Sequence, residues 1–336
     1  MIYRISLLIL IAAILNSCGE SKKKSKTIHF TGIQLDSVMR LFPDSVDLLV
    51  RHGNEAIVGL RYEIAMADGA RAYRLDSSRL DTRMLYAEAL LNKLNHTTDD
   101  IFRAKKQFNY IIKKDSKNPK AFVGLATTYS FLQDNENAFK YINQALRLDP
   151  KYRDAYLLKG SIYRNLGNFE RAVSSYETAV QQDPKFTVGY LWLGSLYEMK
   201  EDPICLEYYT TAYKLEPKNP DVLYSLAYAK QMFGKEKSAA NLYRKMIRQD
   251  SKFYEAYFQL GYMKQFSEKD LDSAMYYYEK VIEIEPKHVE SYHNIGMIYE
   301  ERKDITNALF SYSKALKNNP EFELTKERVA ILKKQR

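Results

Sequence analysis

The chain has 336 residues, of which 46% are apolar and 28% charged, and this composition excludes extended disorder. The 51 Lys and Arg residues against 42 Asp and Glu give a formal charge of +9, spread too thinly to demand a nucleic-acid partner. With two cysteines and 13 glycines, a disulfide-stapled scaffold and a multi-cysteine metal site are excluded, and a sheet-rich enzyme with glycine-rich active loops is disfavoured.

Residues 1–17 are typical of a secretory signal peptide. Arg4 precedes an almost wholly apolar run over residues 5–15, which as a helix is about 16 Å long, too short for a bilayer core of about 30 Å. The run ends in Leu15-Asn16-Ser17-Cys18, which resembles the lipobox of bacterial lipoproteins. That resemblance implies removal of residues 1–17 and a lipid anchor on Cys18. An ordinary signal peptide with a coincidental cysteine is the alternative.

Residues 18–45 are expected to form a tether behind the lipidated cysteine. Four lysines follow a single Glu20, and they are interpreted as a solvated linker, with contact to anionic headgroups as the alternative. Surface-displayed lipoproteins of some diderm bacteria carry an acidic stretch here, and inner-membrane retention is associated with Asp where this chain has Gly19. By resemblance, we expect a lipid-anchored protein of the cell envelope, on the outer membrane and facing the periplasm.

Prolines mark a repeat along the rest of the chain. Their spacings are 34, 33, 69 and 34 residues, at Pro150, Pro184, Pro217, Pro286 and Pro320. Other positions keep the same phase: a first small residue (Ala126, Gly160, Gly194, Ala227, Gly261, Gly296), a second (Ala138, Ala172, Cys205, Ala239, Ala274, Ala308), and an aromatic residue (Tyr176, Tyr209, Tyr243, Tyr278, Tyr312). The phase requires one deleted residue in the third repeat and one inserted residue in the fifth.

Each period contains two segments with helical spacing of apolar residues, for example 153–166 and 169–182. Two helices pack closely only where a small residue lies at their approach, and aromatic residues fill the wider gaps. The pattern resembles the tetratricopeptide repeat, best seen in Tyr190-x2-Leu193-Gly194-x2-Tyr197. Six clear repeats are expected over residues 119–152, 153–186, 187–219, 220–253, 254–288 and 289–322.

Two degenerate repeats are expected over residues 46–118, at 46–79 and 80–118, and a C-terminal capping helix over 323–336. The predicted fold class is therefore all-α: a tetratricopeptide superhelix, or α-solenoid, of six clear and two degenerate helix-turn-helix repeats.

The resemblance implies that the first helix of each repeat lines a concave groove. Its groove-facing pairs, spaced i, i+4, are Val123/Thr127, Leu157/Ser161, Leu191/Ser195, Tyr224/Tyr228, Phe258/Tyr262 and His293/Met297. The change to aromatic residues in the last three pairs predicts a hydrophobic groove for a peptide or helix of a partner protein. Polar rim contacts are expected from Lys120, Arg164, Gln231 and Gln265. The alternative is that these rings only complete the packing between helices.

Other functions find no support in the sequence. The Lys and Asn residues with which chaperone-type relatives clamp a peptide carboxylate are replaced by Val123, Thr127, Leu158, Val188 and Trp192. There is no phosphate loop, nucleophile elbow or HExxH motif, and Cys205 is interpreted as a packed thiol. We therefore expect no catalytic residues, no metal, no cofactor, no nucleic acid and no small-molecule substrate.

The expected function is a membrane-anchored scaffold or adaptor for envelope proteins. Resemblance to lipid-anchored repeat adaptors suggests partners such as cell-wall hydrolases or secretion and pilus components. A surface-exposed receptor component that captures a glycan or peptide is the alternative.

Overall fold

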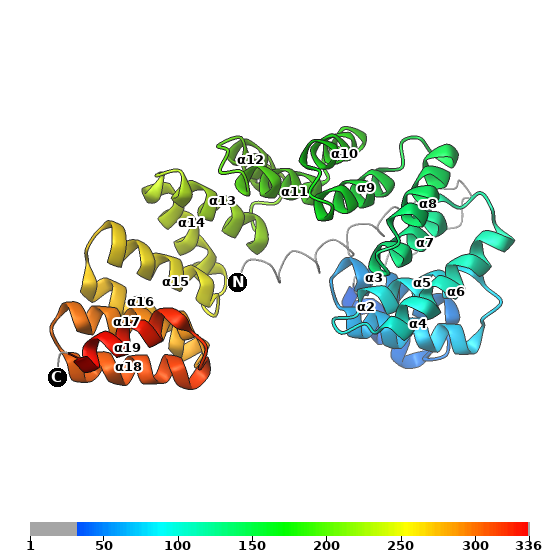
Figure 1. Cartoon of the computed structure of the whole chain (residues 1–336). Coiled ribbons are helices and arrows are strands. Elements are labelled where there is room, and N and C mark those ends of the chain that lie inside the picture. The colour runs from blue at the N-terminus through cyan, green and yellow to red at the C-terminus, as the bar shows by residue number, and fades with distance from the viewer. Residues whose placement is uncertain (1–31, 335–336) are drawn as a thin grey trace. The chain divides into compact units, whose positions relative to one another are not determined.

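The computed structural model describes residues 32–334, so the signal peptide and Cys18 lie outside the described residues. Within this range the chain forms α-helices and one π-helix and no strand, as the sequence predicted (Figure 1). None of these helices combines the length and apolar character needed to cross a membrane. The helices fall into two compact bodies, named here the N-terminal body (residues 32–196) and the C-terminal body (residues 197–334).

The N-terminal body begins with helix α2 and then forms successive helix pairs. Its helices are α2 (Gly32–Leu41), α3 (Val46–Val58), α4 (Tyr62–Leu75), α5 (Leu80–Asn92), α6 (Thr98–Lys114), α7 (Pro119–Phe131), α8 (Asn135–Leu148), α9 (Arg153–Asn165) and α10 (Phe169–Gln182). Helix α11 (Thr187–Glu198) ends this body and contributes its last two residues to the next.

The C-terminal body continues the helix pairs and ends in a single helix. Its helices are α12 (Cys205–Leu215), α13 (Pro220–Met232), α14 (Glu236–Gln249), α15 (Tyr254–Tyr262), the π-helix η1 (Met263–Ser267), α16 (Leu271–Ile284), α17 (Val289–Glu301), α18 (Ile305–Asn318) and α19 (Glu323–Lys334). The pairing follows the predicted all-α repeat, with α3–α6 in the two degenerate repeats and α19 as the capping helix.

Helix α2 occupies a segment that the sequence analysis had placed in the tether. Leu35 on this helix is fully buried, and α2 packs against α3. Residues 32–41 are therefore part of the folded N-terminal body rather than linker.

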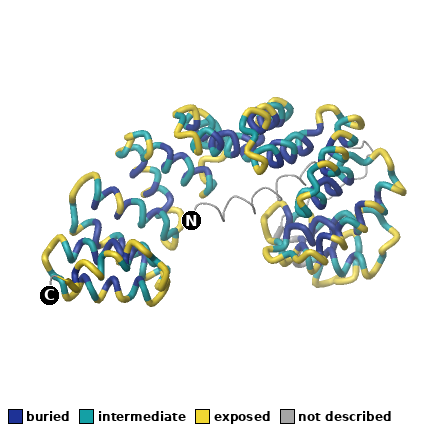
Figure 2. The backbone as a smooth tube through the Cα atoms, in the orientation of Figure 1, coloured by how far each residue is buried: buried dark blue, intermediate teal, exposed yellow. Residues whose placement is uncertain are grey.

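Glycine and tyrosine together set the spacing of the two helices in a repeat. A Cβ atom added at Gly160 would lie 2.5 Å from the Tyr176 ring, and one added at Gly296 would lie 2.4 Å from the Tyr312 ring. Both tyrosines are fully buried. Figure 2 shows the general pattern, with buried residues along the helix faces that meet and exposed residues in the connecting turns.

The turn inside seven of the eight repeats uses a left-handed residue, and in six of these it lies seven positions after the first small residue. Gly167 and Gly234 adopt φ near +70° at this position without strain, because glycine has no Cβ. The other five repeats place a residue with a side chain there, and its φ lies between 53° and 62°. These residues are Leu60, Gln133, Glu201, Lys269 and Lys303. Lys269 lies eight residues after Gly261, the first small residue of its repeat, because this repeat contains the inserted residue.

A second recurring turn joins one repeat to the next. The side chain of an Asp or Asn accepts a hydrogen bond of 2.9–3.1 Å from the backbone N–H two residues later. The acceptors are Asp76, Asp115, Asp149, Asp183, Asp250 and Asn319. Because Asp76 and Asp115 close the two degenerate repeats, those repeats end in the same turn as the clear ones.

The π-helix η1 contains the residue inserted in the fifth repeat. The extra residue falls between Gly261 and Ala274, and the structure accommodates it as one wider turn, Met263–Ser267, at the end of the first helix. A π-turn is the usual way for a helix to absorb a single insertion, and such turns are frequent at functional sites.

Candidate functional site

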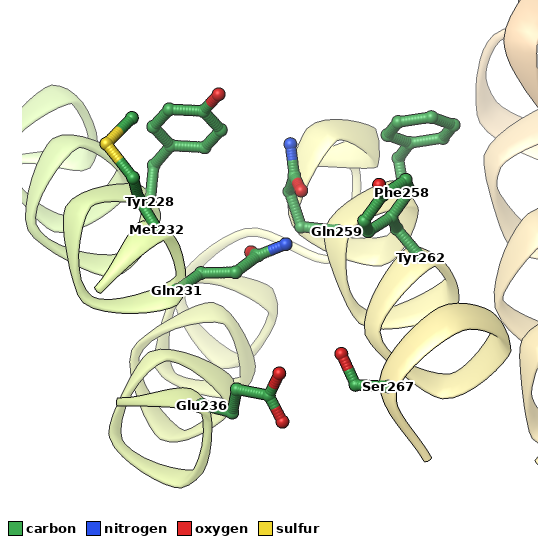
Figure 3. Close-up of a pocket in the computed structure, with 8 residues that line it drawn as sticks. All are labelled: Tyr228, Gln231, Met232, Glu236, Phe258, Gln259, Tyr262 and Ser267. Carbon is green, nitrogen blue, oxygen red and sulfur yellow. The ribbon is translucent and has the colours of Figure 1, made fainter. Parts of the chain in front are cut away.

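Two of the aromatic pairs predicted from the sequence lie at a pocket in the C-terminal body. The pocket has a volume of about 440 Å³ and lies between α13 and the start of α14 on one side and α15 and η1 on the other (Figure 3). Its lining residues are Tyr228, Gln231, Met232, Glu236, Phe258, Gln259, Tyr262 and Ser267. Three of the four predicted groove aromatics therefore contribute to one concave surface.

Tyr224 supports the pocket without lining it. Its ring stacks on Tyr228 with centroids 6.3 Å apart and planes 9° apart, and it packs beside the buried Tyr243. Gln259 Nε2 donates a 3.1 Å hydrogen bond to Tyr224 Oη. The contact ties α13 to α15 across the pocket, and burial raises the pKa of Tyr224. Tyr224 thus has the packing role that the sequence analysis gave as the alternative.

Tyr228 and Tyr262 present ring surface to solvent. Tyr262 is 43% exposed, and its ring lies 4.5 Å from that of Phe266 in the π-helix. Phe258 is half-buried and leans on the buried Tyr278 with a centroid distance of 5.7 Å. Burial raises the pKa of Tyr228, and the neighbouring Glu198 carboxylate adds to the increase. The Tyr228 hydroxyl therefore stays protonated at neutral pH and can donate a hydrogen bond.

The predicted pair His293 and Met297 is covered by the capping helix. His293 is only 8% exposed, its Nδ1 lies 2.8 Å from Thr325 Oγ1, and its ring meets Phe322 edge-on at 5.5 Å. Met297 packs on a cluster that includes Leu332. Residues 322–332 therefore take the place where a partner would lie, and this pair is not part of the open surface.

The predicted rim residues mostly have internal partners. Gln265 is 3% exposed and accepts a 2.9 Å hydrogen bond from Tyr278 Oη, so it lies in the interior and not at a rim. Lys120 pairs at 2.6 Å with Glu88, a buried carboxylate of the preceding repeat, and Arg164 lies 4.2 Å above the Trp192 ring. Among the four, Gln231 alone lines the pocket.

A repeated hydrogen bond explains why a polar residue recurs four positions after the first small residue. In the C-terminal body, the buried tyrosine of each second helix donates to the side chain at that position. The four pairs are Tyr209–Glu198 (2.7 Å), Tyr243–Gln231 (3.0 Å), Tyr278–Gln265 (2.9 Å) and Tyr312–Glu300 (2.8 Å). The position selects an acceptor for the tyrosine, which is why a rim assignment based on helix spacing alone failed at Gln265.

The sequence analysis missed Met232, Glu236, Gln259 and Ser267. Gln259 follows Phe258 directly, so a search for polar neighbours of the aromatic pair would have included it. Glu236 begins the second helix of the preceding repeat, and Ser267 ends the π-helix. Their proximity depends on packing between successive repeats, for which the periodicity carries no direct signal.

Two of the three corresponding pairs in the N-terminal body are buried, and the third, Leu191/Ser195, is partly exposed. Val123 and Leu157 are fully buried, and their partners Thr127 and Ser161 are 4% and 2% exposed. These positions therefore complete the core of that body.

The N-terminal body also contains buried charged side chains. Arg153 joins Asp154 and Asp183 at 2.7 Å each, and Glu88 pairs with Lys120. Burial raises the pKa of Asp154 to about 7, against the opposing effect of Arg153, and raises that of Glu88 against Lys120.

The described residues contain no group of three or more His, Cys, Asp or Glu side chains that could hold a metal ion. Cys205 is buried at the second small position of its repeat, and burial raises its thiol pKa to about 11. A protonated, enclosed thiol is a poor nucleophile.

Two tetratricopeptide-repeat family models match parts of the chain. One matches residues 119–152, 154–186 and 254–288, and the other matches residues 277–310. The chain therefore contains tetratricopeptide repeats. No curated protein matches the sequence.

Several solved structures share the fold. One is the C-terminal part of a TPR repeat-containing protein from Cytophaga hutchinsonii, 20% identical, with a TM-score of 0.58 and coverage of 73% of this chain and 98% of that one. Another is the human IFIT1 dimer with m7Gppp-AAAA, at 18% identity, a TM-score of 0.57 and coverage of 85% and 76%. The APC/C hetero-tetramer Cut9–Hcn1 is 16% identical, with a TM-score of 0.58 and coverage of 89% and 58%. At these identities the likeness shows the fold alone.

Proposed function

We propose that this chain is a lipid-anchored scaffold that binds segments of partner proteins in the cell envelope through the pocket of its C-terminal body. The observation that carries the binding half is the pocket itself: three partly exposed aromatic side chains around about 440 Å³, whereas the pairs Val123/Thr127 and Leu157/Ser161 are buried and the pair His293/Met297 is covered by the capping helix. Aromatic rings give a large contact area at a low cost in side-chain entropy, which suits peptide recognition. Tetratricopeptide-repeat proteins are in general scaffolds rather than enzymes.

The binding half is tested by removing two rings. The double variant Tyr228→Ala/Tyr262→Ala should lose a partner captured by crosslinking in native envelopes while keeping its helical content and melting behaviour, because neither ring is in the closed core. Tyr276→Ala is the matched control, since Tyr276 is 53% exposed on α16 and does not line the pocket. An unchanged set of crosslinked partners in the double variant would show that the pocket assignment is wrong.

The anchoring half of the proposal rests on the sequence resemblance at Cys18. It is tested by feeding cells a fatty-acid analogue that can be coupled to a dye. The wild-type chain should be labelled, Cys18→Ser should not, and Cys205→Ser should be labelled normally, because Cys205 is the only other cysteine. Equal labelling of wild type and Cys18→Ser would contradict the anchor. The envelope, outer-membrane and periplasm-facing location is part of this proposal, and fractionation of the labelled protein checks it.

A further inference from the structure

The charge of the pocket lining is one-sided. Among the eight lining residues, Glu236 is the only Asp, Glu, Lys, Arg or His. Within the described residues it has no ion-pair or hydrogen-bond partner, and Figure 3 shows its carboxylate directed across the opening toward Ser267. No lysine or arginine lines the pocket.

Charged side chains of both signs lie on the helices around the pocket. The acidic neighbours that act on the hydroxyl groups of Tyr224 and Tyr228 are Glu198 and Glu255. Lys264, the lysine of the π-helix, forms ion pairs through its Nζ with the carboxylates of Glu268 at 2.6 Å and Asp270 at 3.4 Å. Two carboxylates thus offset its single positive charge, and the lining carboxylate of Glu236 is the feature that favours a cationic occupant.

The polar atoms that remain available in the wall include donors, such as Gln231 Nε2, whose Oε1 accepts from Tyr243, and acceptors, of which the Glu236 carboxylate is the charged one. Gln259 Nε2 donates a hydrogen bond to Tyr224 Oη, which leaves Oε1 of the same amide available as an acceptor. The Glu236 carboxylate accepts only. An occupant that pairs with the Glu236 carboxylate must supply donors, and arginine has five N–H donors in a planar group.

The aromatic rings fit the same occupant. The faces of Tyr228, Phe258 and Tyr262 carry the negative side of the ring quadrupole, to which a guanidinium is attracted and on which its planar group stacks. The side chain of Met232 offers apolar contact to a hydrocarbon stem. The volume of about 440 Å³ leaves room for the stem and for part of the backbone that carries it.

We propose that this pocket takes an arginine side chain from a protein partner, with its guanidinium stacked on the aromatic rings and paired with Glu236. The proposal rests on the proposed function, since it names the chemistry that the same pocket recognises. Lysine, a neutral apolar side chain and an acidic segment are the competing occupants.

The test begins with selection of peptides from a random 12-residue display library on the full mature chain. Peptides that also bind Tyr228→Ala/Tyr262→Ala are discarded. The proposal expects the remaining peptides to share one arginine. Replacing that arginine by citrulline, which has nearly the same shape but no charge, should weaken binding to the wild-type chain by about tenfold.

A double-mutant cycle separates the ion pair from general peptide binding. On Glu236→Gln, the same replacement should weaken binding by about threefold or less, because the charged partner is gone. On Glu170→Gln, which removes a carboxylate from the first turn of α10 in the N-terminal body, the full tenfold loss should remain. Glu236 is at the first position of α14, so folding of each variant is checked by its melting curve.

The outcomes distinguish the two proposals. Selected peptides that need Tyr228 and Tyr262 but share lysine, acidic or only apolar residues would overturn the arginine assignment and leave the peptide-binding pocket in place. A citrulline effect that is equal on wild type and Glu236→Gln would also overturn it. If no selected peptide depends on the two tyrosines, the binding pocket itself, and with it the arginine assignment, is refuted.

Discussion

The two bodies use the same repeat positions differently. In the N-terminal body, the pairs Val123/Thr127 and Leu157/Ser161 are buried, and charged side chains nearby neutralise one another. In the C-terminal body, the corresponding Tyr228 and Phe258/Tyr262 surround an open pocket with one unpaired carboxylate. The repeat therefore provides the frame, and the side chains at two positions of the first helix decide whether the surface is closed or open.

The C-terminal body also contains an irregular helical turn, the π-helix η1, beside the pocket. All the π-helical residues of the described chain lie in η1, and η1 contributes Ser267 to the pocket and Phe266 to the support of Tyr262. The inserted residue is thus accommodated directly beside the pocket.

The largest effect on stability is expected at the glycines where the two helices of a repeat approach closely, a feature that both bodies share. Gly160→Leu in the N-terminal body and Gly261→Leu in the C-terminal body should each destabilise the fold by about 1–3 kcal/mol, because the new side chain would collide with Tyr176 or Tyr278. Urea denaturation followed by circular dichroism measures the loss, and hydrogen exchange shows whether it stays in the mutated body.

Gly261→Ala is the control for this pair, since the fourth repeat already has Ala227 at the same position. It should cost less than Gly261→Leu. Losses below about 0.5 kcal/mol for both leucine variants would contradict the close helix approach described above.

The buried charges of the N-terminal body predict a pH dependence that the C-terminal pocket lacks. The folded-state pKa of Asp154 is about 7, above its unfolded value of about 3.9, so the folded state binds the proton more tightly. Its contribution to stability is complete below about pH 4 and is lost as the pH rises through 7. Between pH 5 and 8, wild type should lose on the order of 2 kcal/mol from this group.

Asp154→Asn should remove that slope, because an amide does not titrate, while Arg153 keeps Asp183 as a partner. Urea denaturation at several pH values checks it. The two proteins would show parallel pH profiles if Asp154 were ionised throughout, and that result would contradict its burial.

A smaller effect is expected at His293, which the capping helix α19 covers. Thr325→Val keeps the shape of the fully buried Thr325 but removes its hydrogen bond to His293, at a cost of about 1 kcal/mol. Tyr299→Phe serves as a control on the neighbouring surface, with little expected change. A neutral result for Thr325→Val would indicate that His293 is not held by the cap and is available to a partner after all.

The smallest effect concerns the turn inside the repeats. Lys269→Gly and Lys303→Gly should each raise stability by a few tenths to about 1 kcal/mol, because glycine relieves the left-handed backbone at φ near +60°. Gly234→Ala should lower stability by a similar amount. Thermal melts resolve these shifts, and destabilisation by both glycine variants would argue against the assigned turn geometry.

Much of the fold could be predicted because each repeat depends on contacts within about 34 residues. The small positions, the buried tyrosines and the one-residue insertion were visible as a broken period, and the all-α tetratricopeptide fold is confirmed. Helix α2 was missed because a ten-residue helix is too short to carry a clear periodic signal.

The site was predicted less well because it depends on side-chain contacts between different helices, both within a repeat and between repeats. The spacing of one helix placed Tyr228, Phe258 and Tyr262 on the right face. It could not show that Gln265 serves Tyr278 or that the C-terminal helix covers His293, since those partners lie 13 and 32 residues away. Glu236 was missed for the same reason: it reaches the pocket from the turn of the preceding repeat.

The central claim is that the wall formed by Tyr228, Phe258 and Tyr262 contacts a partner protein. The most direct measurement replaces Tyr262 with a photo-crosslinking amino acid in the full chain within cells and compares it with the same replacement at the similarly exposed Tyr276. The account predicts a discrete protein adduct from position 262, abolished by Tyr228→Ala, and none from position 276. Adducts of equal yield at both positions, or an adduct at 262 that persists with Tyr228→Ala, would contradict it.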